Sequence, residues 1–269
     1  MHIAVCIKQI PDAPSIRIDG VRMSIIRDGV ESIINPLDVV ALEAALSLRE
    51  KEGGKVVVLT MGPSHSEEAL LEALAAGADL GVLITDPRLA GADTLATSHT
   101  LARAISLLEP FPDLILCGRQ SMDSDTGQVG PQIAEELDLP QACGVMEINA
   151  EGSALIVRQV SDGFMNTFRV ILPALLTVSR ELCVPRCLSF SGIERAFSKG
   201  KILRWGLEDL KLKQDEVGFD GSATKVLRLY RPPPKKRGEV KTGSTGELVK
   251  SIIHRLESLT IIDEESGAE

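Results

Sequence analysis

Short apolar runs alternate with helix-like segments through the first half of this chain, and this alternation restricts its fold more than any other feature. The runs lie at residues 2–10, 55–62, 80–85 and 113–118. Segments with helical spacing of apolar residues separate or follow them at residues 35–54, 64–77, 93–109 and 131–139. Repetition of strand, helix and strand predicts an α/β fold: a doubly wound, mostly parallel sheet with helices on both faces.

The second half of the chain departs from that alternation. Strand-like stretches at residues 145–150, 154–160 and 168–178 are separated by the turn sequences EG and SDG, which predicts antiparallel or edge additions to the same sheet. The sequence RPPPKKRGEVKTGSTGE then predicts an extended linker, because Pro232 to Pro234 donate no backbone hydrogen bonds. An amphipathic helix is expected at 244–259, with Ser244 and Glu247 at capping-box positions. Its apolar stripe needs a partner surface, either on this chain or on another subunit.

Composition excludes several classes of function. A net charge of -9 and a pI near 5.1 argue against binding to nucleic acid or to an anionic membrane. One Trp and one Tyr leave almost no stacking platform for single-stranded nucleic acid. The five cysteines form an odd, widely spaced set, and Cys183 and Cys187 lack the spacing of a zinc or redox pair. With no apolar run long enough to span a bilayer, these features predict a reducing, cytoplasmic location and no metal site.

Polar, glycine-containing segments follow two of the expected strands and precede helices. In GADTLATSHT, Asp93 can cap a helix whose first turn carries Thr94 and Thr97. In GRQSMDSDTGQVGPQ, residues 118–132, small residues lead into the next helix. Helix N-termini bind phosphate, and ligands of doubly wound sheets lie at the carboxyl ends of the strands. Neither segment matches a P-loop or a GxGxxG fingerprint, so simple caps and turns remain the alternative.

Catalytic residues are not predicted. The four histidines are scattered among unrelated elements, and no GxSxG motif occurs. Asp123 and Asp125 lie in a glycine-flanked loop, where acids are more often turn and cap residues than a catalytic pair.

Several motifs in order make the chain resemble the beta (small) subunit of electron transfer flavoproteins. They are VCIKQIPD, INPLDVVALEAAL, ALAAGAD, GADTLATSHTLA, CGRQSMDSDTGQVGPQIAEEL, LPALLTV and VPRCLSFSGIERAFSK. The resemblance extends to about residue 225. It implies an adenine-nucleotide-hydrolase-like sheet in a nucleotide-binding domain at 1–230, with a C-terminal arm and helix at 231–269 that pack on a larger alpha subunit carrying FAD.

The resemblance also implies a nucleotide in this subunit. In simple members it is a structural AMP, and in electron-bifurcating members it is a second FAD that NADH reduces. Residues 91–100 and 118–132 are most similar to the bifurcating type, so FAD is expected, with AMP as the alternative. The implied cofactor-binding residues are Cys6, Asn35, Pro36, Leu37, Asp38, Met61, Gly118, Arg119, Gln120, Ser121, Met122, Asp123, Ser124, Asp125, Thr126, Gly127, Gln128 and Val129, joined by Thr94 and Thr97 if the ligand is FAD.

The residue types suit such a ligand. Gly118 and Gly127 would let the backbone approach a diphosphate, and Asp38 or Asp123 would accept hydrogen bonds from ribose or adenine. The resemblance implies a docking loop at about 184–200 for a flavin-dependent dehydrogenase of the acyl-CoA or another type, with ferredoxin as a further candidate partner. Phe190 and Ile193 would be its apolar anchors, and Arg195 and Lys199 would supply charge. A different class of function, a stand-alone nucleotide-binding or sensing module, would need neither a docking loop nor a tethered helix.

Overall fold

The computed structural model describes residues 1–12, 17–19, 24–26, 32–227, 238 and 240–259 of the 269-residue chain. The chain divides into two compact units, Met1–Leu229 and Tyr230–Glu269. The linker expected at 231–243 falls largely outside the described residues.

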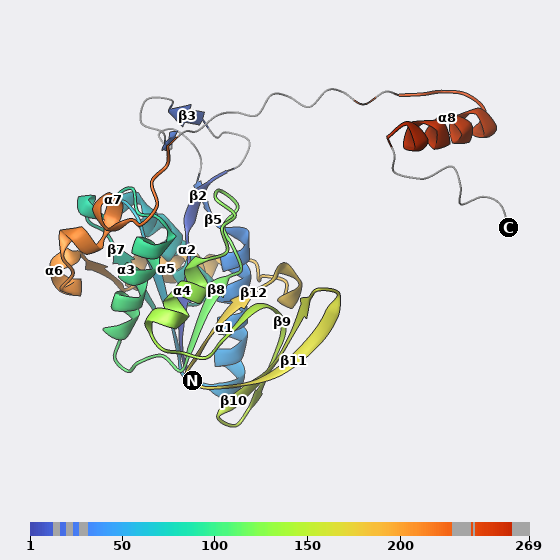
Figure 1. Cartoon of the computed structure of the whole chain (residues 1–269). Coiled ribbons are helices and arrows are strands. Elements are labelled where there is room, and N and C mark those ends of the chain that lie inside the picture. Colours follow the sequence, from blue (N-terminus) through green and yellow to red (C-terminus); the bar gives the residue numbers. More distant parts are fainter. Residues whose placement is uncertain (13–16, 20–23, 27–31, 228–237, 239, 260–269) are drawn as a thin grey trace. The chain divides into compact units, whose positions relative to one another are not determined.

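Within the described residues, nine strands of the first unit form one sheet in the order β11-β10-β9-β12-β8-β1-β6-β7-β13 (Figure 1). Seven of these strands, from β9 through β12, β8, β1, β6 and β7 to β13, run parallel, and β10 and β11 add an antiparallel edge. The predicted doubly wound, mostly parallel α/β fold is therefore confirmed. The strands are β1 (His2–Cys6), β6 (Lys55–Met61), β7 (Leu80–Ile84), β8 (Leu114–Gly118), β9 (Gln141–Glu151), β10 (Ala154–Ser161), β11 (Phe164–Ile171), β12 (Ala174–Val178) and β13 (Ile202–Trp205).

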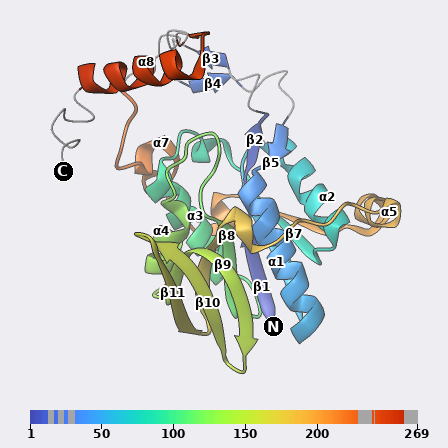
Figure 2. The same ribbon diagram turned by 90° about the vertical axis from the view of Figure 1, so that its right-hand side faces the viewer.

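Helices cover both faces of the sheet, which buries alternate residues of each central strand in two separate cores (Figure 2). One core contains Ile3 and Val5 of β1 with helices α1 (Pro36–Glu52), α2 (Glu67–Ala76) and α5 (Phe190–Lys199). The other contains Ala4 and Cys6 with α3 (Thr94–Ser106), α4 (Val129–Glu136) and α6 (Leu207–Leu210). Short elements complete the unit: α7 (Gly218–Gly221) and 3-10 turns at Ser64–Ser66, Pro87–Leu89, Arg180–Leu182 and Gln214–Glu216.

Two sequence predictions need correction. The first apolar run is not one strand, because β1 ends at Cys6 and β2 (Gln9–Pro11) pairs with β5 (Ser32–Ile34) in a separate ribbon. A second ribbon joins β3 (Arg17–Asp19) to β4 (Ser24–Ile26). Residues 168–178 are likewise two strands, divided at Leu172-Pro173: β11 lies at the edge, whereas β12 is a parallel strand between β8 and β9. Every residue of β12 is buried, as expected for an interior parallel strand.

The second unit contains the predicted amphipathic helix, α8 (Thr245–Ser258). Its capping box is confirmed, because the backbone N–H of Ser244 donates to Oε2 of Glu247 at 2.9 Å. Ile252 and Ile253 are 58% and 43% exposed, so the apolar stripe is open within its own unit. No helix in the described ranges has the length and apolar character needed to cross a bilayer.

The strand order places a topological switch point between β1 and β8. From β1 the chain proceeds through β6 to β7 on one side, then crosses to β8 and β12 on the other. In doubly wound sheets, ligands bind in the crevice outside the carboxyl ends of such a strand pair. The segments that follow β1 and β8 begin at Ile7 and Arg119, so we expect the ligand-binding crevice of this fold between them.

Close packing of α4 on β12 gives a test of the fold. A Cβ added at Gly130 would lie 2.5 Å from Cγ2 of Thr177. Thr177 is buried and its Oγ1 accepts the N–H of Gly144 at 3.0 Å, so it cannot turn away without losing that bond. We expect Gly130→Ala to lower the free energy of unfolding by about 1–3 kcal/mol in urea denaturation. Gly246→Ala in α8 is the control, because an added Cβ there would meet no atom within 4 Å. Equal changes in the free energy of unfolding in the two variants would contradict the close packing at Gly130.

Candidate functional site

Two cysteines lie side by side where β1 and β8 approach their carboxyl ends. Cys6 and Cys117 are register partners on β1 and β8, and both are buried. The neighbouring Cys6 thiol and burial raise the pKa of the Cys117 thiol well above its usual value. A buried thiol of this kind stays protonated and supplies packing, not a nucleophile.

Asp38, in the first turn of α1, joins three elements at the crevice. Its Oδ2 accepts the backbone N–H of Lys8 at 2.8 Å, and its Oδ1 accepts the backbone N–H of Gly118 at 3.1 Å. Burial raises the pKa of this carboxyl to about 7, although hydrogen bonds from Asn35, Lys8 and Gly118 oppose the shift. Asp38 is therefore a structural connection between β1, β8 and α1, and both of its oxygens already have backbone donors.

The structure also changes the reason for the glycine at 118. A Cβ at Gly118 would lie 2.3 Å from Oδ1 of Asp38 and 2.8 Å from the carbonyl carbon of Leu37. The space beside Gly118 is thus filled by the start of α1. Glycine is required there for contact between protein segments, whereas the sequence suggested approach to a diphosphate.

Asn35 occupies the N-cap position of α1, but its side chain does not cap the helix. The side-chain Nδ2 donates to the carbonyl of Gln120 at 3.0 Å, and Oδ1 accepts the N–H of Met122 at 3.2 Å. Asn35 is fully buried. It therefore holds the segment after β8 against the start of α1.

A lysine that sequence analysis did not select completes this arrangement. Nζ of Lys8 lies 2.7 and 2.8 Å from the two carboxylate oxygens of Asp123, and 3.4 Å from Oγ of Ser121. The Asp123 side chain is 4% exposed and the Lys8 side chain is 41% exposed, so the carboxylate is shielded from water while the lysine side chain remains partly open to it. Its position was the one signal in the sequence: Lys8 lies two residues after β1, although the apolar run at 2–10 had included it in the first strand.

The remainder of the predicted loop turns back toward α4. Asp125 and Gly127 have positive φ angles of 56° and 64°. The Asp125 N–H donates to the carbonyl of Ser121 at 2.8 Å, and its carboxylate accepts from the side chain of Gln120. Asp125 thus maintains the fold of the loop, consistent with a turn role.

The two helix starts proposed for phosphate differ in their capping. The Asp93 carboxylate already accepts the N–H of Ala96 at 3.0 Å and so places a negative charge at the start of α3. The start of α4 has no side-chain cap. The Thr94 hydroxyl donates to Oε1 of Gln128 at 3.0 Å, which brings the two helix starts together. An anion is favoured at α4 over α3.

Some predicted cofactor residues lie further from these contacts. Met61 ends β6, which lies beside β1, and is half-buried. Thr97 lies in the first turn of α3, also half-buried. Arg119 is exposed and follows β8 directly, with its N–H bonded to the carbonyl of Val178 at 2.9 Å.

The predicted docking residues divide between two surfaces of α5. Phe190 is 93% exposed and shares one helix face with Ile193 and Phe197, an exposed aromatic that sequence analysis did not select. Arg195 and Lys199 are on the other side of the helix, where they line a groove of about 420 Å³ with Arg49, Leu74, Gly77, Ala78, Asp79, Ala196, Gly200 and Lys201. The expected loop is therefore a helix whose apolar and cationic residues face different directions.

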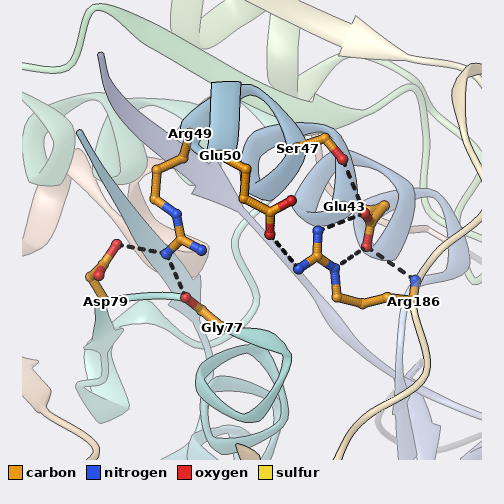
Figure 3. A network of polar contacts seen from close by, with 7 residues as sticks. All are labelled: Glu43, Ser47, Arg49, Glu50, Gly77, Asp79 and Arg186. Atoms are coloured by element: carbon orange, nitrogen blue, oxygen red, sulfur yellow. Dashed lines mark hydrogen bonds and ion pairs between the residues drawn. The ribbon is translucent and has the colours of Figure 1, made fainter. Parts of the chain in front are cut away.

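An arginine network fastens the start of this docking segment to α1 (Figure 3). Arg186 donates to both oxygens of Glu43 at 2.8 and 2.9 Å and to Glu50 at 2.6 Å. Burial alone would raise the pKa of the Glu43 carboxyl. Hydrogen bonds from Arg186 outweigh that effect and hold the pKa below its usual value. Nearby, Arg49 donates to the carbonyl of Gly77 at 2.7 Å, at the end of α2.

Asp38 gives a prediction for stability and its dependence on pH. With a pKa of about 7 the Asp38 carboxyl is protonated at pH 5, yet each of its oxygens keeps a lone pair, whereas the NH2 group of an amide accepts no hydrogen bond. Asp38→Asn should therefore lower the free energy of unfolding by about 1–3 kcal/mol at pH 5. Because the folded pKa, about 7, exceeds the reference 3.8, the wild-type advantage is complete below about pH 4 and decreases as pH rises through 7. The difference between the two proteins should be smaller at pH 8.

Urea unfolding at both pH values measures this difference. Glu135→Gln, at an exposed position of α4, controls for the loss of one negative charge. A difference between wild type and Asp38→Asn that grows from pH 5 to pH 8 would contradict the assignment.

Arg186→Met tests the attachment of the docking segment. The substitution removes the side-chain donors to Glu43, whose side chain is 11% exposed, and should destabilise the chain by about 2 kcal/mol. Amide hydrogen exchange at residues 183–189 should accelerate more than exchange in α3. Arg180→Met, at an exposed position, is the control. Unchanged exchange in Arg186→Met would show that the network does not hold the segment.

A doubly wound, mostly parallel sheet with polar loops at its switch point is an architecture that binds ligands at the carboxyl ends of its strands. The model of the electron transfer flavoprotein domain matches residues 22–209. Electron transfer flavoprotein subunit beta of Thermoanaerobacterium thermosaccharolyticum is 47% identical over 97% of this chain and 100% of its own length. The chain therefore belongs to the electron transfer flavoprotein family, as a beta subunit that functions in electron transfer.

Two further relatives cover nearly the whole chain. Caffeyl-CoA reductase-Etf complex subunit CarD of Acetobacterium woodii is 44% identical over 97% of this chain and 100% of its own length. Protein FixA of Sinorhizobium fredii is 39% identical over 95% of this chain and 92% of its own length.

Proposed function

We propose that this beta subunit binds FAD in the crevice between β1 and β8, pairs with an alpha subunit, and takes part in flavin-based electron bifurcation with NADH as the electron donor. The observation that supports it most is the convergence of the segments after β1 and β8 with the start of α1. Asp38, Asn35 and Lys8 hold these three segments together by direct contacts. Bound FAD would supply the redox chemistry, and this chain would supply position and electrostatic field.

The diphosphate is assigned to the start of α4. Its first N–H groups have no side-chain cap, and Gly127 directly before it has the positive φ that lets the backbone turn toward a ligand. Gln128 and Val129 belong to the same turn. The capped start of α3, with Asp93, suits a neutral part of the ligand better than a phosphate.

Hydroxyl groups on α3 favour FAD over AMP. The Thr94 hydroxyl lies 3.0 Å from the Gln128 amide oxygen, so polar groups continue past the start of α4. A ligand that ends at one phosphate would not need them. The similarity to a subunit of a caffeyl-CoA reductase-Etf complex supports a role in a dehydrogenase or reductase assembly.

The partners follow from the exposed faces of the two units. Phe190, Ile193 and Phe197 on α5 form an apolar face for a flavin-dependent dehydrogenase, with charged groups at the adjoining groove. The stripe of α8 would pack on the alpha subunit. Ferredoxin is a candidate low-potential acceptor. All five cysteines are free thiols, which suits the cytoplasmic location proposed here.

A stand-alone nucleotide sensor is the alternative. It shares the crevice, but the exposed apolar residues of α5 and α8 have no purpose in it. A chain that is a stable monomer, binds ATP and has no affinity for an alpha subunit would support the sensor instead.

Counting the nucleotides released by the denatured heterodimer tests the cofactor assignment. We expect two flavins for each heterodimer, with NADH bleaching one of them first. One flavin and one AMP would contradict the FAD proposal and favour the non-bifurcating type.

Substitutions at two glycines test where in this chain the nucleotide binds, with the same measurement of nucleotide content. Gly127→Leu forces a branched side chain into positive φ beside the proposed diphosphate, so one nucleotide should be lost while the alpha-subunit flavin stays. Gly152→Leu is the matched control, because Gly152 has a φ of 59° in the turn between β9 and β10 and no neighbouring atom within 4 Å. Equal nucleotide content in both variants would show that the diphosphate lies elsewhere.

A further inference from the structure

Three hydrogen bonds of the backbone hold Lys8 in place, independently of its side chain. Its backbone N–H donates to Asp38 at 2.8 Å, and its carbonyl accepts the N–H of Asn35 at 2.8 Å. The N–H of Ile7, directly before it, donates to Leu59 of β6 at 2.9 Å. The Lys8 backbone is thus fixed against β6 and the start of α1, so binding of its side chain costs only the freedom of the side-chain torsions.

From that fixed point the side chain crosses the switch point. Its ammonium contacts both oxygens of Asp123 and the hydroxyl of Ser121, in the segment that follows β8. The Ser121 hydroxyl in turn lies 2.8 Å from that of Ser124. The Asp123 side chain is 4% exposed and that of Lys8 is 41% exposed, so this ion pair is partly buried and is screened less than a pair with both partners in solvent.

We infer that Lys8 is a positioning residue of the nucleotide site, which fastens the segment 119–128 across the crevice and thereby sets the affinity for an adenine nucleotide with a diphosphate. The affinity part rests on the proposed function. The fastening part rests on the contacts alone. Asn35 holds Gln120 and Met122 at the other side of the same segment, so Lys8 and Asn35 fix it at two points.

Pre-organisation explains the expected effect on binding. A segment that is already ordered loses less conformational entropy when a ligand binds to it. Without the lysine, the contact at Asp123 is lost and Asn35 holds the segment only at Gln120 and Met122, so more of the ordering would fall to the nucleotide. Gly127 and the start of α4 carry the proposed diphosphate contacts and follow Asp123 closely in the chain. Loss of the contact at Asp123 should therefore make these residues more mobile as well.

The experiment uses the heterodimer with its alpha subunit and compares Lys8→Met with Lys8→Arg. FAD and AMP are titrated separately into protein stripped of nucleotide, and amide exchange of residues 119–128 is followed without nucleotide. We expect Lys8→Met to weaken FAD binding by about 10- to 100-fold and to accelerate that exchange. Lys8→Arg, which can still donate to Asp123, should stay within about threefold of wild type.

Two further variants separate positioning from general stability. Asp123→Asn keeps the side-chain shape and removes the ion pair, so it should reproduce the faster exchange even if Lys8→Met fails to fold. Lys55→Met, at an exposed position where β6 begins, removes a lysine at the opposite edge of the sheet and should change neither readout.

The outcomes distinguish the inference from the proposed function. Wild-type exchange rates in both Lys8→Met and Asp123→Asn would overturn the fastening role, whatever the ligand. Faster exchange with unchanged FAD affinity would overturn the positioning role. A wild-type heterodimer that takes up only AMP at this site would overturn the FAD proposal, while the exchange data would still decide the role of Lys8.

Discussion

The buried carboxylate of Asp38 is the interaction on which the binding edge of this protein depends. It satisfies backbone donors of Lys8 and Gly118, which follow and end the two strands of the switch point, and it belongs to the helix that begins beside them. Burial of a carboxylate is unfavourable, and backbone donors reduce that cost. The same three segments are then joined by Asn35 and Lys8, so the crevice walls are held by polar contacts within the chain. A ligand site whose walls are already ordered needs little rearrangement to bind.

The sequence predicted those parts of the fold in which local pattern and final environment agree. Helix α1 begins at Pro36 and ends before Gly53, close to the bounds 35–54 expected from its helical spacing. The error at β12 has a physical cause: Pro173 lies inside one apolar run, and periodicity alone could not show that the chain leaves an edge strand there and enters the centre of the sheet. The resemblance implies a docking loop at about 184–200, and residues 190–199 of that stretch form helix α5. Gly192 is needed for packing, since a Cβ there would lie 2.3 Å from the carbonyl oxygen of Ala75.

The sequence predicted where the candidate site lies better than it predicted what each residue of the site does. Asn35, Asp38 and Gly118 were selected as ligand contacts, and the structure joins them to one another. Their spacing in the sequence could not distinguish a contact to a nucleotide from a contact between segments 80 and 87 residues apart. Lys8 was overlooked because a lysine next to a strand is ordinarily a solvated residue. Its importance depends on Asp123, which is close to it only in the folded chain.

Helix α1 links the crevice to the docking segment. Asp38 in its first turn lies at the crevice, and Glu43 and Glu50 further along hold Arg186, at the start of the segment that continues into α5. A helix of 17 residues is about 25 Å long and does not bend easily. A protein that binds α5 would therefore find the proposed cofactor edge at a separation set by one helix.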